Sequence, residues 1–137
     1  MSLGEFETSV EYEDKAIRLS PHDPNPGFWD MTKGEAYFGL KQYDQAIESA
    51  RKSIAINPNY VPFAHGDLIA ALVLTGRGLE AREALERYLA LPSPALKTVA
   101  AWRAYRDQNA YPHTDPRYLE SFDRLIEGLR KAGMPEQ

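Results

Sequence analysis

The residues that could support acid–base or metal chemistry in this chain are three histidines and 20 carboxylates. Two histidines each stand two positions before an aspartate, as His65 and Asp67 and as His113 and Asp115. On a helix that spacing directs the two side chains to different faces, and the sequence contains no HExxH motif. We therefore expect no metal site. His22 and His113 are interpreted as loop residues, and His65 as lying in a groove or at the edge of the core.

Other catalytic and nucleotide-binding chemistry lacks its characteristic residues. Cysteine is absent, which excludes disulfides, thiol catalysis and cysteine metal sites. The glycines at 76 and 78 lack the preceding strand and the third glycine of a dinucleotide-binding motif, and no P-loop is present. The carboxylates are spread over polar helix faces, as in the acidic cluster of residues 5–13. We expect no catalysis and no cofactor.

The overall charge argues against nucleic acid or membrane as a partner. A formal net charge of −4 gives no general attraction to phosphate backbones or anionic lipids. The aromatic and arginine residues of the segment 102–106 are interpreted as part of a packed helix rather than a base-stacking surface. No apolar run approaches the roughly 20 residues of a membrane span, and no signal-peptide pattern opens the chain. These features predict a cytoplasmic protein, and residues 1–3 are typical of an added start sequence.

The elements that would position side chains are best defined in the segment Gly27–Pro58. It predicts two amphipathic helices joined by a short turn at 40–42. Small residues on the facing sides allow two antiparallel helices to approach closely, and Pro58 ends the second helix. The apolar stripe of the second helix consists of Tyr43, Ala46, Ile47, Ala50 and Ile54.

This helix pair resembles the tetratricopeptide repeat (TPR). The positions that carry the resemblance are Gly34, Ala36-Tyr37, Tyr43, Ala46-Ile47 and Pro58, which match the family's glycine, tyrosine, alanine and closing proline. The chain departs from the family pattern at Asp30 and Lys33, where apolar residues are usual, and at Lys41, which replaces the turn glycine.

The segments before and after this pair predict an array. Residues 4–21 match the second half of a repeat, because Phe6 precedes Pro21 by the same interval as Tyr43 precedes Pro58. This half repeat leaves an apolar face near Phe6 and Val10 without a partner, so we expect a fragment of a longer protein. Residues 26–58 and 61–92 form full repeats, the latter with the alanine- and leucine-rich composition common in bacterial TPRs.

The end of the chain departs from the repeat. Residues 95–133 predict a degenerate repeat whose last helix, beginning after a cap at Asp115-Pro116, closes the array. The expected fold is therefore all-α: a TPR-like α-solenoid of antiparallel helix pairs, with about seven helices and a C-terminal capping helix, forming one domain over residues 4–137.

The last helix carries a second resemblance. The segment Pro116–Glu136 is similar to the C-terminal end of TPR regions on bacterial class III adenylate and guanylate cyclases of the rhizobial type, and Ala16–Pro24 is similar to an earlier repeat of such proteins. The resemblance implies a role in cAMP signalling, with a catalytic domain upstream. None of that domain's metal or nucleotide residues would then lie in this chain.

The TPR resemblance also implies a binding surface, because such arrays present the first helix of each pair along a concave wall. The residues expected on that wall are Phe28, Met31, Glu35, Phe38, Phe63, Asp67, Ala70 and Val73. This mixture of apolar and acidic residues suits a peptide with apolar anchors and a basic residue. The alternative is that the phenylalanines are ordinary packing residues. The lysine and asparagine clamp for a terminal carboxylate is not matched, since Met31 and Glu35 stand there.

The sequence thus predicts a non-catalytic protein–protein interaction module, the regulatory C-terminal part of a cyclase, that binds a protein or peptide. A second copy docking on the unpartnered N-terminal face would make a homodimer. The first alternative is an adaptor region of a transcriptional regulator or secretion component. The second is a small enzyme or ligand-binding domain that would use His65, Asp67 and Glu35 together in one polar pocket.

Overall fold

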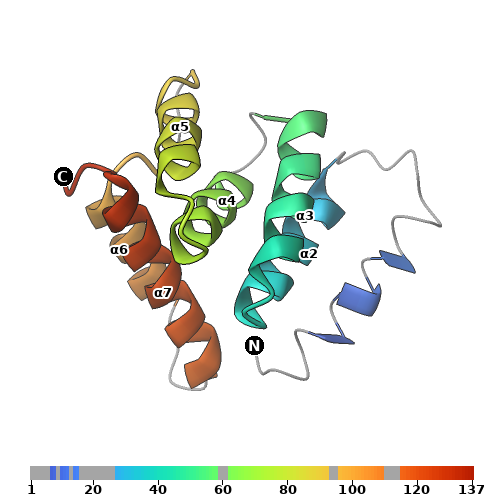
Figure 1. Ribbon diagram of the computed structural model, residues 1–137. Coiled ribbons are helices and arrows are strands. Elements are labelled where there is room, and N and C mark those ends of the chain that lie inside the picture. The colour runs from blue at the N-terminus through green and yellow to red at the C-terminus, as the bar shows by residue number, and fades with distance from the viewer. Residues whose placement is uncertain are drawn as a thin grey trace.

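The computed structural model describes residues 7–8, 10–12, 14–15, 27–58, 62–92, 96–109 and 115–137, and the regular structure in these residues is entirely helical. The described residues between 7 and 15 lie in the segment predicted as the first helix. The helices that follow among the described residues are α2 (Phe28–Gly39), α3 (Tyr43–Ile56), α4 (Phe63–Leu74), α5 (Gly78–Leu89), α6 (Val99–Gln108) and α7 (Pro116–Ala132) (Figure 1). The predicted all-α, TPR-like fold is confirmed. The division into repeats stays a prediction.

The helices α2 and α3 form a close antiparallel pair. A Cβ added at Gly34 of α2 would lie 3.5 Å from the backbone nitrogen of Ala50 and 3.6 Å from the carbonyl oxygen of Ala46 in α3. The close approach expected from small residues is therefore present. The turn between the helices passes through Lys41, whose φ of 62° is in the left-handed region. Lysine at this position carries backbone strain that the family's glycine would avoid.

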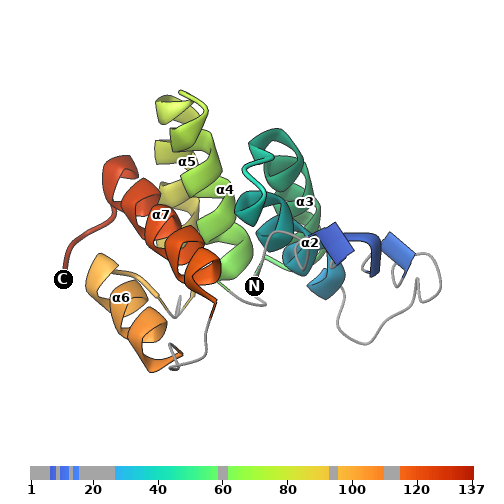
Figure 2. The ribbon, with the colours of Figure 1, turned by 90° about the horizontal axis from the view of Figure 1, so that it is seen from below.

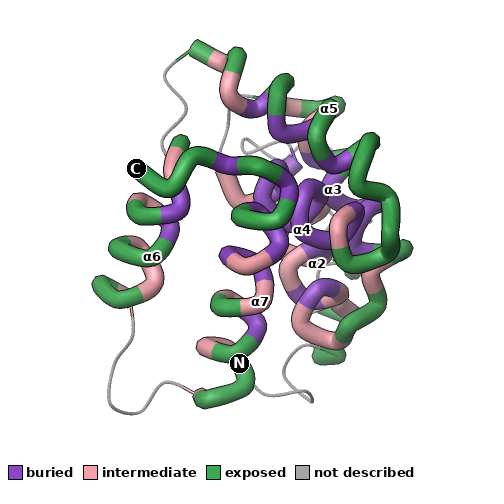
Figure 3. The backbone as a smooth tube through the Cα atoms, turned by 60° about the vertical axis from the view of Figure 1, so that its left-hand side comes forward, coloured by how far each residue is buried: buried purple, intermediate pink, exposed green. Residues whose placement is uncertain are grey.

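The helix α4 is the centre of the molecule. Every residue from Ala64 to Leu72 is buried, including three polar or glycine positions, so the helix has no solvent-facing side over that length. It packs against α3, α5 and α7 and also contacts α2. Figure 3 shows most of α4 as buried, whereas the outer turns of α5 and α6 are exposed. A helix that is apolar nearly all round requires cover on all sides, and its neighbours supply it.

The helix α7 provides that cover on one whole side. It packs along α4, touches α2 and α5, and has α6 against its outer side (Figure 2). Gly128 permits the contact, since a Cβ there would lie 2.7 Å from Cβ of Ala70. The helix α6 reaches α4 chiefly through its buried Trp102, because a Cβ at Gly66 of α4 would lie 2.7 Å from Cη2 of that ring.

Caps and a backbone link fix the ends of α6 and α7. The predicted cap at Asp115 is present: its Oδ1 accepts from the backbone nitrogen of Arg117 at 2.8 Å, and Pro116 begins the helix. Beyond α7, the carbonyl oxygen of Pro135 accepts from the backbone nitrogen of Val99 at 2.8 Å. The carbonyl oxygen of Glu136 likewise accepts from the backbone nitrogen of Ala100 at 2.9 Å. The residues after α7 therefore return to the first turn of α6 and satisfy two of its free N–H groups.

Candidate partner-binding site

A cavity of about 250 Å³ lies between α2, α4, α6 and α7. Six of the eight residues predicted for the concave wall line it: Phe28, Met31, Glu35, Phe38, Phe63 and Asp67. The remaining lining residues are Thr32 of α2, Tyr105 of α6, and Tyr118, Ser121, Phe122 and Leu125 of α7. Residues of α2 and α4 that were predicted for the wall therefore form one side of a partly open cavity, and residues of α6 and α7 form the opposite side.

Helical spacing explains how each element presents its residues. The α2 residues recur at intervals of three or four from position 28 to position 38, so they share one helix face. Phe63 and Asp67 of α4 are four positions apart, and the α7 residues follow the same interval from 118 to 125. The periodicity that predicts amphipathic helices thus also aligns their lining faces.

Asp67 is the most unusual residue of the site. Its side chain is 1% exposed, and its Oδ2 has no hydrogen-bond partner among the residues that the structure describes. Burial raises the pKa of Asp67 well above its ordinary value of 3.8, and the nearby negative charge of Glu35 raises it further. A buried carboxylate oxygen without a partner costs free energy, which a ligand that donates a hydrogen bond would recover.

Tyrosine hydroxyls share these electrostatic surroundings. Burial raises the pKa of Tyr105, and the charge of Glu35 adds to the effect. The pKa of Tyr118 is raised first by burial and then by Glu35, with a further contribution from Asp67. The protonation of the four groups in the cavity is therefore electrostatically linked. They are Glu35, Asp67, Tyr105 and Tyr118.

The rings of the site form a continuous aromatic wall. The ring centroids of Phe63 and Tyr105 are 5.2 Å apart in an edge-on arrangement. Tyr105 stacks on Phe122 at 6.0 Å with an interplanar angle of 15°, and Tyr118 meets Phe122 at 6.4 Å. These distances are typical of favourable aromatic pairs, so the wall is held in place by its own contacts.

Two of the predicted wall residues do not line the cavity. Ala70 is fully buried, with Gly128 of α7 packed directly on it. Val73 is partly buried against the core. The prediction placed both on an open wall, but α7 covers this end of α4. In turn, the predicted wall did not include Thr32, Tyr105 and Ser121, which do line the cavity. The spacing of Tyr118, Phe122 and Leu125 places them on one face of α7, but it does not reveal that this face meets α4.

His65 is separate from the site, since it is not among the residues that line the cavity. Nε2 of His65 donates to the carbonyl oxygen of Pro58 at 2.8 Å, and its ring lies 5.1 Å from that of Tyr88. Burial lowers the pKa of His65 below 6.5, although the bond to Pro58 opposes this. His65 is therefore a buried packing residue, and the structure does not bring it together with Asp67 and Glu35. His22 and His113 lie outside the described residues.

Arg124 fastens α7 beside the cavity. Its Nη1 donates to the carbonyl oxygen of Phe38 at 3.0 Å and to the hydroxyl of Tyr43 at 2.8 Å, while Nε pairs with Glu120 at 3.0 Å. The guanidinium also lies 5.0 Å from the centroid of the Phe38 ring. These contacts join α7 to the turn between α2 and α3.

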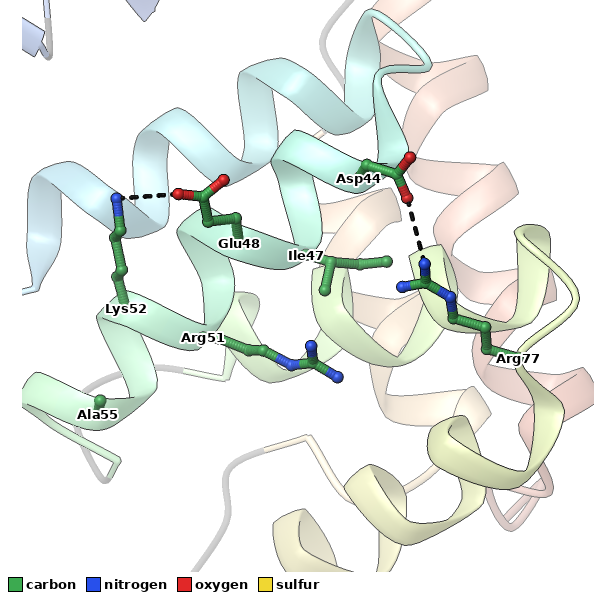
Figure 4. Close-up of a pocket in the computed structure, with 7 residues that line it drawn as sticks. All are labelled: Asp44, Ile47, Glu48, Arg51, Lys52, Ala55 and Arg77. Atoms are coloured by element: carbon green, nitrogen blue, oxygen red, sulfur yellow. Dashed lines mark ion pairs between the residues drawn. The ribbon is translucent and has the colours of Figure 1, made fainter.

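A second hollow, of about 490 Å³, lies on the outer side of α3 and the start of α5 (Figure 4). Its charged side chains are largely exposed and pair with each other: Asp44 with Arg77 at 3.7 Å and Glu48 with Lys52 at 3.2 Å. Arg51 pairs with Glu80 at 3.1 Å. Such surface pairs contribute little energy, and none of the described residues that line this hollow has a buried side-chain oxygen or nitrogen without a partner. It is the weaker candidate.

Within the described residues no group of three or more histidine, cysteine, aspartate or glutamate side chains could hold a metal ion. None of the helices described is long and apolar enough to cross a membrane. The functional groups that the described lining residues present to the cavity are two carboxyl groups, hydroxyls and aromatic rings.

Comparison with known proteins agrees with the fold. Residues 31–60, from within α2 to just beyond α3, match the tetratricopeptide repeat family. Fold and match together define the class as a TPR-like helical array, which indicates a protein–protein interaction module. Among curated proteins, the chain is similar to the small glutamine-rich tetratricopeptide repeat-containing protein 2 of Mycosarcoma maydis, with 31% identity over 87 residues. The match covers 64% of this chain and 24% of that protein, so the chain spans about a quarter of its relative's length.

Proposed function

We propose that this chain is a non-catalytic module that binds a protein or peptide partner at the cavity between α2, α4, α6 and α7. The observation that carries the proposal is the cavity itself: six residues expected on a TPR binding wall line one site, and half of the residues that line this site are aromatic. Apolar pockets with a few placed polar groups are the usual form of a recognition site.

The lining residues favour binding over catalysis. Acid–base catalysis requires a group positioned to move a proton to or from a substrate. His65, which a catalytic role would use, contacts Pro58 and Tyr88 rather than the cavity. The two carboxyl groups and the hydroxyls can orient a ligand, and the rings can bury its apolar part.

A display library of random peptides, selected on the intact chain, tests the proposal. We expect the selected peptides to shift the backbone amide resonances of α2, α4 and α7. Thr32→Trp would fill the cavity and weaken binding by at least about tenfold, which corresponds to about 1.4 kcal/mol.

The matched control is Thr75→Trp. Thr75 makes the same hydrogen bond to the carbonyl four residues earlier, to Ala71 at 2.8 Å, as Thr32 makes to Phe28 at 2.9 Å, but it lies outside the cavity. This variant should bind as the wild type does. The proposal fails if no peptide is selected or if both tryptophan variants bind equally well.

We further propose that the chain is the C-terminal regulatory part of a bacterial adenylate or guanylate cyclase that acts in the cytoplasm. The support is the resemblance of Pro116–Glu136 and Ala16–Pro24 to such proteins. This resemblance is separate from the similarity to tetratricopeptide repeat proteins. The coding sequence upstream of this segment tests it. A cyclase domain there would support the proposal, and a DNA-binding or secretion domain would overturn it in favour of the adaptor hypothesis.

A homodimer through the N-terminal segment is part of the same proposal. In that segment Tyr12 is 61% exposed, and its ring lies 5.6 Å from Trp29 of α2. Asp14 forms an ion pair with Lys33, and Val10 is half-buried. Phe6 lies outside the described residues. Sedimentation equilibrium should show a monomer–dimer equilibrium that Tyr12→Glu shifts toward monomer, whereas a monomer at every concentration would exclude the dimer.

A further inference from the structure

One side-chain oxygen at the cavity is buried and has no hydrogen-bond partner among the described residues. Oδ2 of Asp67 is buried and lacks a hydrogen bond, although Asp67 lines a space of about 250 Å³. The charge of Glu35 acts on the same carboxyl group. A ligand that donates hydrogen bonds and carries positive charge would satisfy Asp67 and favour its ionised form.

Half of the lining residues are aromatic. They are Phe28, Phe38, Phe63, Tyr105, Tyr118 and Phe122. Aromatic faces attract cations, more strongly where water is excluded. The protein already uses one of these rings in this way, since Arg124 lies 5.0 Å from the centroid of Phe38 on the flank of the site. Rings and carboxyl groups therefore select for the same charge.

The size of the cavity further limits the kind of ligand that can fit. Sites for whole small molecules usually measure roughly 300–1,000 Å³, and this one is smaller. It suits a single side chain of a larger partner. No lysine, arginine or histidine is among the described residues that line it, so the positive charge would have to come from that partner.

We propose that the cavity binds a lysine side chain of the partner peptide, with its ammonium group at Oδ2 of Asp67 and near Glu35, and its alkyl stem against the aromatic wall. The inference rests on the proposed function and names the anchor residue of the ligand. Lysine fits better than arginine because an ammonium is compact and has three donors, whereas a guanidinium has five in a fixed plane and would leave several unsatisfied.

The test uses Nα-acetyl-lysine methylamide as the probe, with the norleucine analogue as the uncharged control of equal stem length. Titration into the intact 15N-labelled chain should shift the amide resonances of Thr32, Glu35 and Asp67 with the lysine probe. The norleucine probe should bind at least tenfold more weakly. Equal binding of the two probes would overturn the inference.

Variants locate the contact. Asp67→Asn keeps the shape of the side chain and should weaken lysine binding at least tenfold, and Glu35→Gln should weaken it to a smaller extent. Asp44→Asn, which removes an exposed carboxylate of α3, is the matched control and should leave binding unchanged. An Asp67→Asn protein that keeps the wild-type amide spectrum and binds the lysine probe as tightly as the wild type would also overturn the inference.

The two proposals fail in different ways. If display selects peptides that Thr32→Trp weakens, but replacing their lysines by norleucine has no effect, the lysine inference is wrong and the binding function stands. If no peptide binds at all, the proposed function is wrong.

Discussion

At the scale of single residues, the features that matter most are polar groups placed where burial penalises them. Asp67 is enclosed by helices from both ends of the described chain, and its pKa is raised first by burial and then by the charge of Glu35. An acid that is neutral in the folded state and charged in the unfolded state makes stability depend on pH.

We predict that Asp67 contributes a loss of stability as pH rises above about 4, where Asp67 of the unfolded chain gives up its proton while the folded chain keeps it. The loss continues until the raised pKa of the folded state is passed, at up to about 1.4 kcal/mol per pH unit. Asp67→Asn lacks this titration, so its stability relative to the wild type should increase across the same range.

Urea unfolding measured at several pH values, with Asp44→Asn as an exposed control, checks this prediction. Parallel stability curves for the wild type and Asp67→Asn would contradict it.

Lys41 is a second residue at an unfavourable position, because it has a left-handed backbone conformation that favours glycine. Its φ of 62° is similar to the φ of 78° at Gly76, which lies in the turn between α4 and α5. The backbone N–H groups of both residues donate to a carbonyl oxygen three positions earlier. Lys41→Gly should therefore raise the free energy of unfolding by about 0.5–1 kcal/mol. This net gain is the backbone strain that glycine relieves, reduced by the extra conformational entropy that glycine gives to the unfolded chain.

The control for this prediction is Lys41→Ala, which keeps the strain and should change little. Gly76→Ala should lower stability by about 1 kcal/mol, the reverse of the effect at Lys41. Thermal unfolding measures all three variants. A Lys41→Gly protein no more stable than Lys41→Ala would show that the turn is not strained.

At the scale of elements, the helices could be predicted from the sequence but the partner of the last helix could not. Periodicity identifies which face of α7 is apolar, and that face does carry the buried Leu125, Ile126 and Leu129. It does not specify what the face packs against. An open wall was expected at Ala70 because a repeat array exposes it, whereas here Gly128 rests on that residue.

The close contact between α7 and α4 at Gly128 predicts that adding one methyl group there lowers the stability of the protein considerably. Gly128→Ala would place Cβ 2.7 Å from Cβ of Ala70 and 2.9 Å from its Cα. Although alanine favours a helix, we expect a net destabilisation of about 1–3 kcal/mol because α7 must move away from α4.

Gly78→Ala serves as the control, since a Cβ there would meet nothing within 4 Å. It should be neutral or slightly stabilising. Chemical unfolding of the two variants side by side separates the steric effect from helix propensity, and equal stabilities would mean that the α4–α7 interface can adjust freely.

At the scale of the whole molecule, the class of fold could be predicted from the sequence, and the binding wall stays a prediction. The packing of α6 and α7 on the far side of the cavity could not be predicted. Residues 28–38 and 63–67 share one surface because paired helices repeat, and repetition is local in sequence. The opposite wall comes from Tyr105 and α7, which meet α2 and α4 only through long-range packing. Arg124 illustrates this, since its partner Phe38 is 86 positions away and no pattern relates the two.

Arrays of repeats usually lose stability unit by unit, because each unit contacts only its neighbours. Arg124 joins α7 to the α2–α3 turn and thereby couples helices that are far apart in the sequence. Arg124→Met, which keeps a long apolar stem, should lower stability by about 1–2 kcal/mol through the lost charged hydrogen bonds. Hydrogen exchange should then become faster in α2 and in the first turns of α7 than in α4.

Arg103→Met, which removes an exposed arginine of α6, is the control and should leave these exchange rates unchanged. Uniformly faster exchange in every helix of the Arg124→Met protein would indicate general destabilisation instead of lost coupling.

The late position of α7 in the chain has a consequence for synthesis. When α4 emerges from the ribosome, α7, which will cover the Ala70 side of α4, has not yet been translated. The apolar residues on that side of α4 therefore stay exposed to solvent until α7 has been synthesised. A nascent chain stalled before residue 116 should therefore be captured by chaperones more readily than one stalled after residue 137.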